Sequence, residues 1–417
     1  MIVTLFVGFI TLFVFLRTKK NFILFLPIIN VISDSAIYFS SGSLLNTGDL
    51  RAIFVCAYIF HYFTNYKIKT SVINSTIILF FLYCILNILL QSSNISYSLQ
   101  YSFKIFITLF LFIIAKNHIN SLSQLSIFCT NIFIALLIQL CVTIFSNIFK
   151  IGDSQYLKDS FYEGTGGAPV VIILFSLITI PLFLFLKQIY SEKINKKIII
   201  SAVVISIVII LISMRRTTIA SLLVTILFFA LTHNNKKAVL KYITLMLTFL
   251  VALFPFFAKK LYDIYEFRFV KHSKTLDQEG RYKETQMVIK QIYNFDLKSF
   301  FGIEPFNSYG YNMAQFHIDR QFHTFHTILL HGVGIIGFTI YIALFTMIFI
   351  KIRLLRKKCK NYSLLYITSL ILFFAYIVQI ISFGIEIISL NSIVFIFIGA
   401  YIGITENDNN LNLIEQN

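Results

Sequence analysis

Hydrophobic stretches of helix length recur from one end of the chain to the other, separated by short polar connections. An α-helix needs about 20 mainly apolar residues to cross a bilayer. The pattern therefore predicts about thirteen membrane-spanning helices. They lie near residues 1–16, 22–40, 50–64, 72–91, 98–115, 125–148, 168–186, 197–214, 217–232, 239–258, 326–350, 363–382 and 384–404.

One long polar interruption divides this pattern. We therefore expect helices 1–10 within residues 1–258, a long loop at 259–325, helices 11–13 within 326–404 and a polar tail at 405–417. Inside the loop, Met287, Val288 and Ile292 recur near helical spacing among charged residues. This spacing predicts an amphipathic helix over 279–295 that lies at the membrane surface.

The composition agrees with a membrane protein. Hydrophobic residues make up 58% of the 417 residues and charged residues only 13%, whereas a soluble domain carries about 25% charge. Mean hydropathy is +0.82. We therefore expect an all-α, polytopic membrane helix bundle of about 12–13 transmembrane helices in which helices pack in lipid, with short helices in one long extracytoplasmic loop.

The net charge of +17 reflects topology and does not predict a nucleic-acid partner, because Lys and Arg gather in the short connections. The odd-numbered connections hold nineteen of them. The even-numbered short connections hold six: Arg51, Lys104, Lys150, Lys158, Arg215 and Arg216. Since Lys and Arg favour the cytoplasmic side, we expect the N-terminus outside, the C-terminus inside and the odd connections in the cytoplasm.

Three polar features then share the extracytoplasmic side: the Gly-rich loop EGTGGAP (163–169), the segment SMRRT (213–217) and the long loop. An arginine guanidinium suits phosphate, which it binds in a bidentate manner. Arg215 and Arg216 are therefore phosphate-binding candidates, although they could also cap a hairpin turn and contact lipid headgroups. Arg281 has a simpler alternative, an exposed ion pair with Glu279 or Glu284.

Three histidines, His323, His326 and His331, lie at the entrance to the eleventh hydrophobic stretch. No HExxH or Cys pair accompanies them, so the spacing gives weak support to a metal site. Proton removal is favoured instead, because histidine is the usual general base near neutral pH. For His326 and His331, hydrogen bonding to a neighbouring helix is the favoured interpretation.

In their order, these segments resemble the family of O-antigen ligases and polysaccharide polymerases, which are polytopic membrane glycosyltransferases. The resemblance rests on Ser213, Arg216 and Thr217 at a helix end, Gly280-Arg281 at the start of an amphipathic helix, Phe301-Gly302-Ile303-Glu304, and Gly334-Ile335-Ile336-Gly337. Counting back from the last motif aligns His323 with the family's histidine. The chain departs from the family at Thr324, Val170 and Glu304, the last of which replaces a glycine.

The resemblance implies a GT-C-like fold and a metal-independent, inverting transfer without a cofactor. The donor would be an undecaprenyl-diphosphate-linked oligosaccharide, bound through its diphosphate by Arg215, Arg216 and Arg281, with His323 as the catalytic base. The residues with an implied supporting role are His326, Gly164, Gly166 and Gly167. The implied location is the bacterial cytoplasmic (inner) membrane, with membrane lipid and a chain-length regulator or flippase of the same pathway as partners.

Two alternatives accompany the polymerase interpretation, which is favoured because the chain has no appended soluble domain. A ligase would use the same donor and transfer it to lipid A core or to a protein. A flippase for the same lipid-linked sugar belongs to another class; such transporters have internal repeats and charges near the midplane. The only acidic residues within hydrophobic stretches are Asp34 and Glu386, and the two halves show no repeat.

Overall fold

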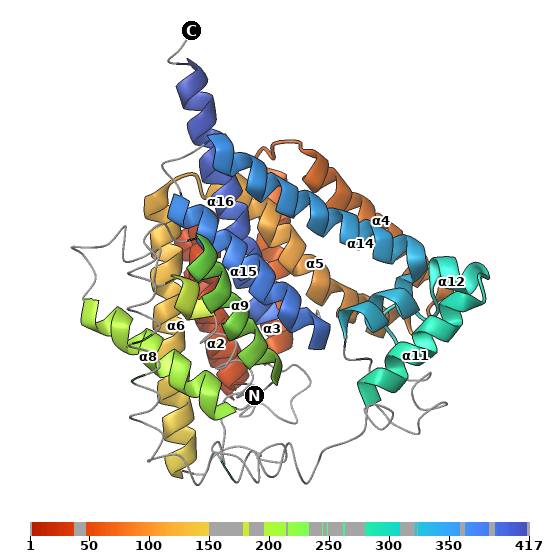
Figure 1. Ribbon diagram of the computed structural model, residues 1–417, viewed down its shortest axis with the longest axis horizontal. Coiled ribbons are helices and arrows are strands. Elements are labelled where there is room, and N and C mark those ends of the chain that lie inside the picture. Colours follow the sequence, from red (N-terminus) through yellow and green to blue (C-terminus); the bar gives the residue numbers. More distant parts are fainter. Residues whose placement is uncertain are drawn as a thin grey trace. The chain divides into compact units, whose positions relative to one another are not determined.

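All regular structure in the described part of this computed structural model is helical (Figure 1). The structure describes residues 2–36, 47–149, 178–182, 196–213, 216–232, 280–308, 324–358, 363–382 and 388–414, with the single residues 244, 248, 262 and 322. The elements are α1 (Ile2–Thr18), η1 (Lys19–Phe25), α2 (Leu26–Ala36), α3 (Thr47–Asn65), α4 (Val72–Gln91), α5 (Ile95–His118), α6 (Leu122–Phe149), α8 (Lys196–Ser213), α9 (Arg216–Thr232), α11 (Gly280–Tyr293), α12 (Leu297–Phe301), α14 (Phe325–Lys358), α15 (Ser363–Ser382) and α16 (Ile388–Ile414).

Among the described residues, six helices are long and apolar enough to cross a membrane: α4, α5, α6, α14, α15 and α16. Each coincides with a hydrophobic stretch that the sequence marks as a span. Shorter apolar segments, Ile200–Ile210 and Thr218–Phe228, lie within α8 and α9. The prediction of a polytopic membrane helix bundle is thus confirmed, whereas the count of thirteen and the GT-C-like arrangement stay predictions.

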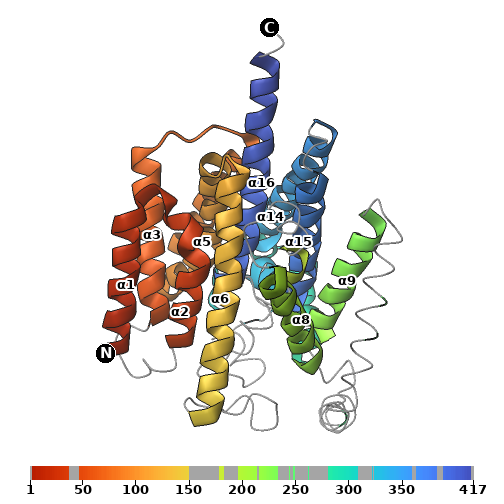
Figure 2. The same cartoon turned by 90° about the vertical axis from the view of Figure 1, so that its left-hand side faces the viewer.

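The stretch predicted as one helix over 22–40 is divided. A 3-10 helix, η1, precedes α2, which begins at Leu26 with Pro27 in its first turn. Proline has no backbone N–H and is tolerated only where a helix needs none, at its start. Pro27 therefore fixes the beginning of α2. Figure 2 shows α1 beside α2.

The chain divides into two compact units: unit 1 holds residues 1–54, 123–273 and 363–375, and unit 2 holds 55–122, 274–362 and 376–417. Unit 1 contains a buried ion pair between α2 and the start of α3. Arg51 Nη1 lies 2.5 Å from Asp34 Oδ1, and both side chains are only 8% exposed. The same Nη1 donates to Asn30 O at 3.3 Å.

This pair corrects the interpretation of Arg51 as a charge in a connection. A buried guanidinium is stable only when a carboxylate or other acceptors compensate for its lost hydration, and Asp34 does so here. Lys104 is likewise a residue of α5, where its Nζ lies 5.6 Å from the Tyr101 ring centre. Arg216 is the first residue of α9, so three of the six positive charges assigned to even connections belong to helices.

Unit 2 is built on the contact between α5 and α16. Gly399 and Gly403 lie one turn apart on α16, and a β-carbon at Gly403 would lie 2.3 Å from Lys116 O. A β-carbon at Gly399 would lie 2.6 Å from Phe112 O. Small residues at this spacing allow two membrane helices to approach until their backbones touch.

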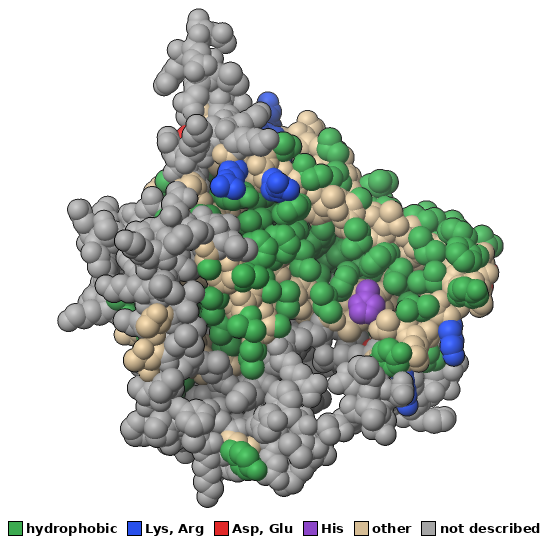
Figure 3. All heavy atoms as spheres, in the orientation of Figure 1, with side chains coloured by type: hydrophobic (Ala, Val, Ile, Leu, Met, Phe, Trp, Pro, Cys, Tyr) green, Lys and Arg blue, Asp and Glu red, His purple; other side chains and the backbone are tan. Residues whose placement is uncertain are grey.

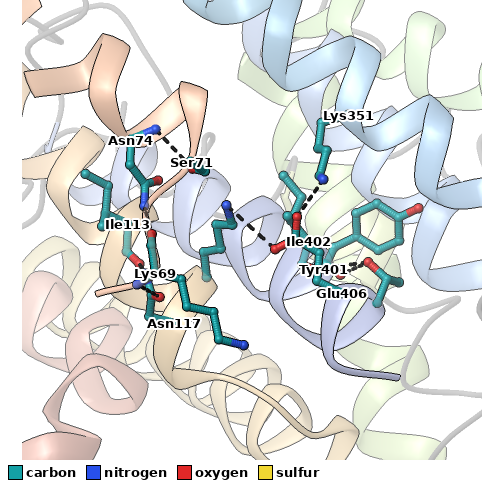
Figure 4. Close-up of polar contacts among 11 residues, drawn as sticks. Lys69, Ser71, Asn74, Ile113, Asn117, Lys351, Tyr401, Ile402 and Glu406 are labelled. Carbon is teal, nitrogen blue, oxygen red and sulfur yellow. Dashed lines mark hydrogen bonds and ion pairs between the residues drawn. The ribbon is translucent and has the colours of Figure 1, made fainter. Parts of the chain in front are cut away.

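One end of unit 2 joins basic residues of two helices to a single carboxylate on a third (Figure 4). Glu406 of α16 lies 2.6 Å from Lys351 Nζ of α14 and 3.6 Å from Lys116 Nζ of α5. At the same end, Lys69 N donates to Asn117 Oδ1 at 2.9 Å. The connection before α4, the end of α5 and the end of α14 thus share one end of the unit.

The opposite end of unit 2 joins the connection between α4 and α5 to the segment after α12. The Ser93 N–H and hydroxyl donate to Glu304 Oε2 at 3.0 and 2.9 Å. The charge pattern predicts these two segments on one side and the three basic connections on the other, and within unit 2 the structure agrees. Which end faces the cytoplasm stays a prediction.

Loss of one partner of the buried pair should destabilise the protein more than loss of both. Asp34→Asn or Arg51→Gln alone leaves an uncompensated buried charge, which costs about 3–5 kcal/mol. The double variant removes both charges and should regain a large part of that loss. The coupling free energy between the two residues is measured from thermal unfolding of fluorescent fusions in detergent, with size-exclusion chromatography as the detection method. Stability losses of the two single variants that simply add in the double variant would contradict the pairing.

Candidate functional site

The long polar interruption contains a helical hairpin made of α11 and α12, here called the α11–α12 hairpin (residues 280–302). The structure begins α11 at Gly280 and ends it at Tyr293, close to the predicted 279–295. Asp296 then caps α12 by accepting from Ser299 N at 2.8 Å. Hydrogen bonds from Ser299 lower the pKa of the Asp296 carboxyl, so the cap is ionised near neutral pH.

The buried face of α11 is largely polar, which corrects the predicted amphipathic face. Glu284, Val288 and Gln291 are buried and follow one another at intervals of four and three residues, along one side of the helix. Of the three apolar residues on which the prediction rested, only Val288 is buried, and Met287 and Ile292 are half-buried. The helix therefore directs a carboxylate and an amide toward the interior of unit 2.

Gln291 joins three segments of unit 2. Its side-chain oxygen lies 2.9 Å from His331 Nδ1 of α14, and its backbone oxygen accepts from the Ser299 hydroxyl at 2.7 Å. Its amide nitrogen also donates to Lys298 O at 3.4 Å. His331 is fully buried, with its ring edge-on to Phe322 at 4.9 Å between centroids. His331 therefore has a structural role, as the sequence predicts.

His326 occupies the first turn of α14 and is half-buried. Its Nε2 lies 3.1 Å from Thr285 Oγ1 of α11 and 3.3 Å from Thr324 Oγ1. Thr324 Oγ1 in turn lies 2.8 Å from Thr327 Oγ1. The predicted hydrogen bond from His326 to a neighbouring helix is thus present. Threonine hydroxyls both donate and accept, so Thr285 and Thr324 can form hydrogen bonds with either tautomer of the His326 imidazole.

Three glycines let the end of α12 cross the beginning of α14 at backbone contact. Gly334 has φ 64°, and it divides α14 by a kink that the sequence does not predict. A β-carbon at Gly334 would lie 2.3 Å from Phe300 O, and one at Gly302 would lie 2.4 Å from Gly332 O. Ile303 N donates to His331 O at 2.6 Å across the crossing. Only glycine fits these positions without displacing backbone.

This crossing is also joined to α4. The Tyr83 hydroxyl donates to Val333 O at 2.9 Å, and the Asn87 amide donates to Phe301 O at 3.1 Å. Val333 precedes the kink, where a carbonyl loses its helical partner. The two side chains of α4 thus satisfy backbone carbonyls on both crossing segments.

Glu304 has φ 49°, in the left-handed region that favours glycine. A glycine would adopt this conformation without strain. In this chain the carboxylate instead accepts two hydrogen bonds from Ser93. Those bonds offset the strain of about 1–2 kcal/mol that a β-carbon brings to this conformation.

Most of the predicted site residues have no described side chain. Arg216 is the first residue of α9 in unit 1, and Arg281 is the second residue of α11 in unit 2. Five further predicted site residues lie outside the described residues: His323, Arg215, Gly164, Gly166 and Gly167. In the part of the chain that the structure describes, no three or more His, Cys, Asp or Glu side chains form a group that could hold a metal.

Comparisons with protein-family models, curated proteins and solved structures found no match to this chain. The family resemblance therefore stays a hypothesis based on motifs. Two of those motifs, Phe301–Glu304 and Gly334–Gly337, meet at the glycine crossing in unit 2.

The sequence interpretation missed Glu284, Thr285 and Gln291 as residues of the site. Their signal is the spacing of polar residues along α11: Glu284 and Gln291 lie two turns apart on one face with Val288 between them. Polar residues normally face water, so this spacing by itself favours the solvated side of the helix. The packing of α11 against α14 shows instead that Glu284 and Gln291 lie on the buried side of the helix.

Substitution of Gly334 should destabilise unit 2. In Gly334→Ala, a β-carbon in the left-handed region costs about 1–2 kcal/mol, and it also meets Phe300 O. Gly8→Ala is the matched control, because a β-carbon there meets the side chain of Leu50, which can rotate away. Thermal unfolding in detergent should show a lower midpoint for Gly334→Ala alone; equal midpoints would contradict the crossing.

Loss of the Gln291 amide should loosen the hairpin without unfolding the bundle. Gln291→Leu leaves buried polar groups without their partner, at a cost of about 1–3 kcal/mol. Hydrogen–deuterium exchange of peptides covering 297–303 and 331–337 should become faster. Gln286→Leu changes an exposed glutamine of the same helix and should leave both peptides unchanged. Similar exchange in the two variants would argue against the role of Gln291.

Proposed function

We propose that this protein is a membrane glycosyltransferase, most simply an O-antigen or capsular polysaccharide polymerase, that uses undecaprenyl-diphosphate-linked oligosaccharide on the extracytoplasmic face. The observation that carries the proposal is the hydrogen bond between Thr285 of α11 and His326 of α14. It joins the helix that begins with Gly280-Arg281 to the helix that follows His323. These are the two segments to which the family resemblance assigns diphosphate binding and proton removal.

Sequence spacing brings the proposed groups close to this contact. Position 281 lies four residues before Thr285 on α11, and residues at that spacing lie on the same side of a helix. His323 precedes the first turn of α14, in which His326 contacts Thr285. An arginine and a histidine from segments far apart in the chain are therefore expected at one end of unit 2.

In the proposed reaction, Arg281 and Arg216, with Arg215, bind the diphosphate of the donor. The acceptor hydroxyl oxygen attacks the anomeric carbon from the face opposite the diphosphate, and the bond between that carbon and the diphosphate oxygen breaks. His323 takes the hydroxyl proton. The guanidinium groups stabilise the charge on the departing polyprenyl diphosphate, and the configuration at the anomeric carbon is inverted.

The remaining predicted residues have supporting roles in this proposal. The His326 imidazole, held by Thr285 and Thr324, fixes the start of α14 and hence the backbone that carries His323. Gly164, Gly166 and Gly167 would let a loop backbone approach the donor. A ligase would use the same groups and differ only in its acceptor, so the product identifies the activity.

Substitution of the proposed groups should abolish transfer while the protein remains in the membrane. His323→Ala and Arg281→Ala should each reduce glycan transfer at least 100-fold, the lower range of what a general base or a charge-stabilising group contributes. Lys283→Ala is the control, because it removes an exposed cation of the same helix and should leave transfer near the wild-type rate. The assay uses protein in nanodiscs with purified lipid-linked oligosaccharide and a chelator.

The products of that assay separate the alternatives. Longer carrier-linked chains mean a polymerase, and transfer only to added lipid A core means a ligase. Sugar that moves across proteoliposomes without a new glycosidic bond would mean a flippase. Wild-type transfer by His323→Ala would contradict the assignment of the base.

A further inference from the structure

The α11–α12 hairpin carries apolar side chains on its outward surface. Tyr293, Leu297, Phe295 and Ile289 are 80%, 77%, 67% and 56% exposed, respectively. They cluster where α11 ends and α12 begins. Together they are called the hairpin tip (residues 289–297). Soluble surfaces rarely gather large apolar side chains in this way unless a partner or a membrane covers them.

At four positions of α11 the polarity is reversed relative to a helix in water. Glu284 and Gln291 are buried toward unit 2, whereas Ile289 and Tyr293 point outward. A helix that faces water on its outer side would place these residues the other way round. The reversal is expected if the outer side contacts an apolar medium.

The apolar surface of the tip continues onto a predicted membrane span. The Asn87 amide of α4 donates to Phe301 O at 3.1 Å, so the end of α12 lies against the last turns of α4. On α4, Leu86, Leu89 and Leu90 are exposed, as expected of a lipid-facing helix surface. Figure 3 shows hydrophobic side chains along α4 and α14 and onto the hairpin.

The charges near the tip fit a lipid headgroup layer. Lys283, Lys290 and Lys298 are all exposed on the hairpin. The exposed carboxylate of Asp296, within the tip, is held by hydrogen bonds from Ser299. Lysine ammonium groups beside aromatic and aliphatic side chains are typical of segments that lie at the membrane interface.

We propose that the hairpin tip is embedded in the interfacial region of the bilayer. In this arrangement Tyr293, Phe295 and Leu297 enter the acyl-chain boundary, and Lys290 and Lys298 contact anionic lipid phosphates. The inserted residues differ from Met287, Val288 and Ile292, on which the sequence prediction of an interfacial helix rests. Insertion of the tip fixes α11 at the level of the lipid headgroups, with its polar face toward α14. The proposal does not depend on glycosyl transfer.

Spin labels test the insertion directly. Single cysteines at positions 289, 293 and 297 are introduced after replacement of Cys56, Cys84, Cys129, Cys141 and Cys359, and the labelled proteins are placed in nanodiscs of phosphatidylethanolamine and phosphatidylglycerol. Lys283→Cys and Gln286→Cys are controls on the same hairpin but outside the tip. The ratio of accessibility to oxygen over a water-soluble nickel chelate should be at least threefold higher at positions 293 and 297 than at the controls.

Two results would overturn the proposal. Equal ratios at tip and control positions would mean that the tip lies in water. Low accessibility of positions 293 and 297 to both reagents would mean that protein covers the tip. Because all labelled positions are exposed, folding should be retained, and a monodisperse size-exclusion profile verifies this for each variant. As a second measurement, Leu297→Asp should lower the ratio at position 293 toward the control value.

Discussion

The crossing of α12 over the kink of α14 is the contact on which the proposed site depends. Gly302, Gly332 and Gly334 allow two backbones to touch where any side chain would separate them. Once they touch, the α11–α12 hairpin has a fixed register against α14. That register brings Gln291 to His331 and Thr285 to His326. A membrane bundle has little hydrophobic driving force between its helices, so close packing and buried hydrogen bonds must hold such elements together.

The same contact explains why α11 buries polar residues. Each buried polar group needs a partner, and the imidazoles of α14 supply partners for Thr285 and Gln291. The outward surface of the hairpin carries the apolar side chains of Ile289, Tyr293, Phe295 and Leu297. One helix thus faces a polar interior on one side and the proposed lipid layer on the other, which suits a site whose substrate has a lipid tail and a charged head.

Much of the fold, but little of the site, follows from the sequence. Hydrophobic length predicts α4, α5, α6, α14, α15 and α16, because the bilayer imposes helices of that length. Local spacing also predicts the bounds of α11. It cannot predict the buried face of α11, the kink at Gly334 or the pairing of Asp34 with Arg51, because each depends on a partner distant in the chain. The spacing of the polar residues on α11 is equally compatible with a helix face exposed to water and with a face buried against the imidazoles of α14.

We propose that α11 and the start of α14 form a site that transfers sugar from a polyprenyl diphosphate. The most direct measurement is the stoichiometry and stereochemistry of turnover by the purified protein in nanodiscs with a chelator. We expect one polyprenyl diphosphate to be released for each glycosidic bond formed, with inverted anomeric configuration by nuclear magnetic resonance. Loss of lipid-linked donor without a new glycosidic bond, or retention of configuration, would contradict it.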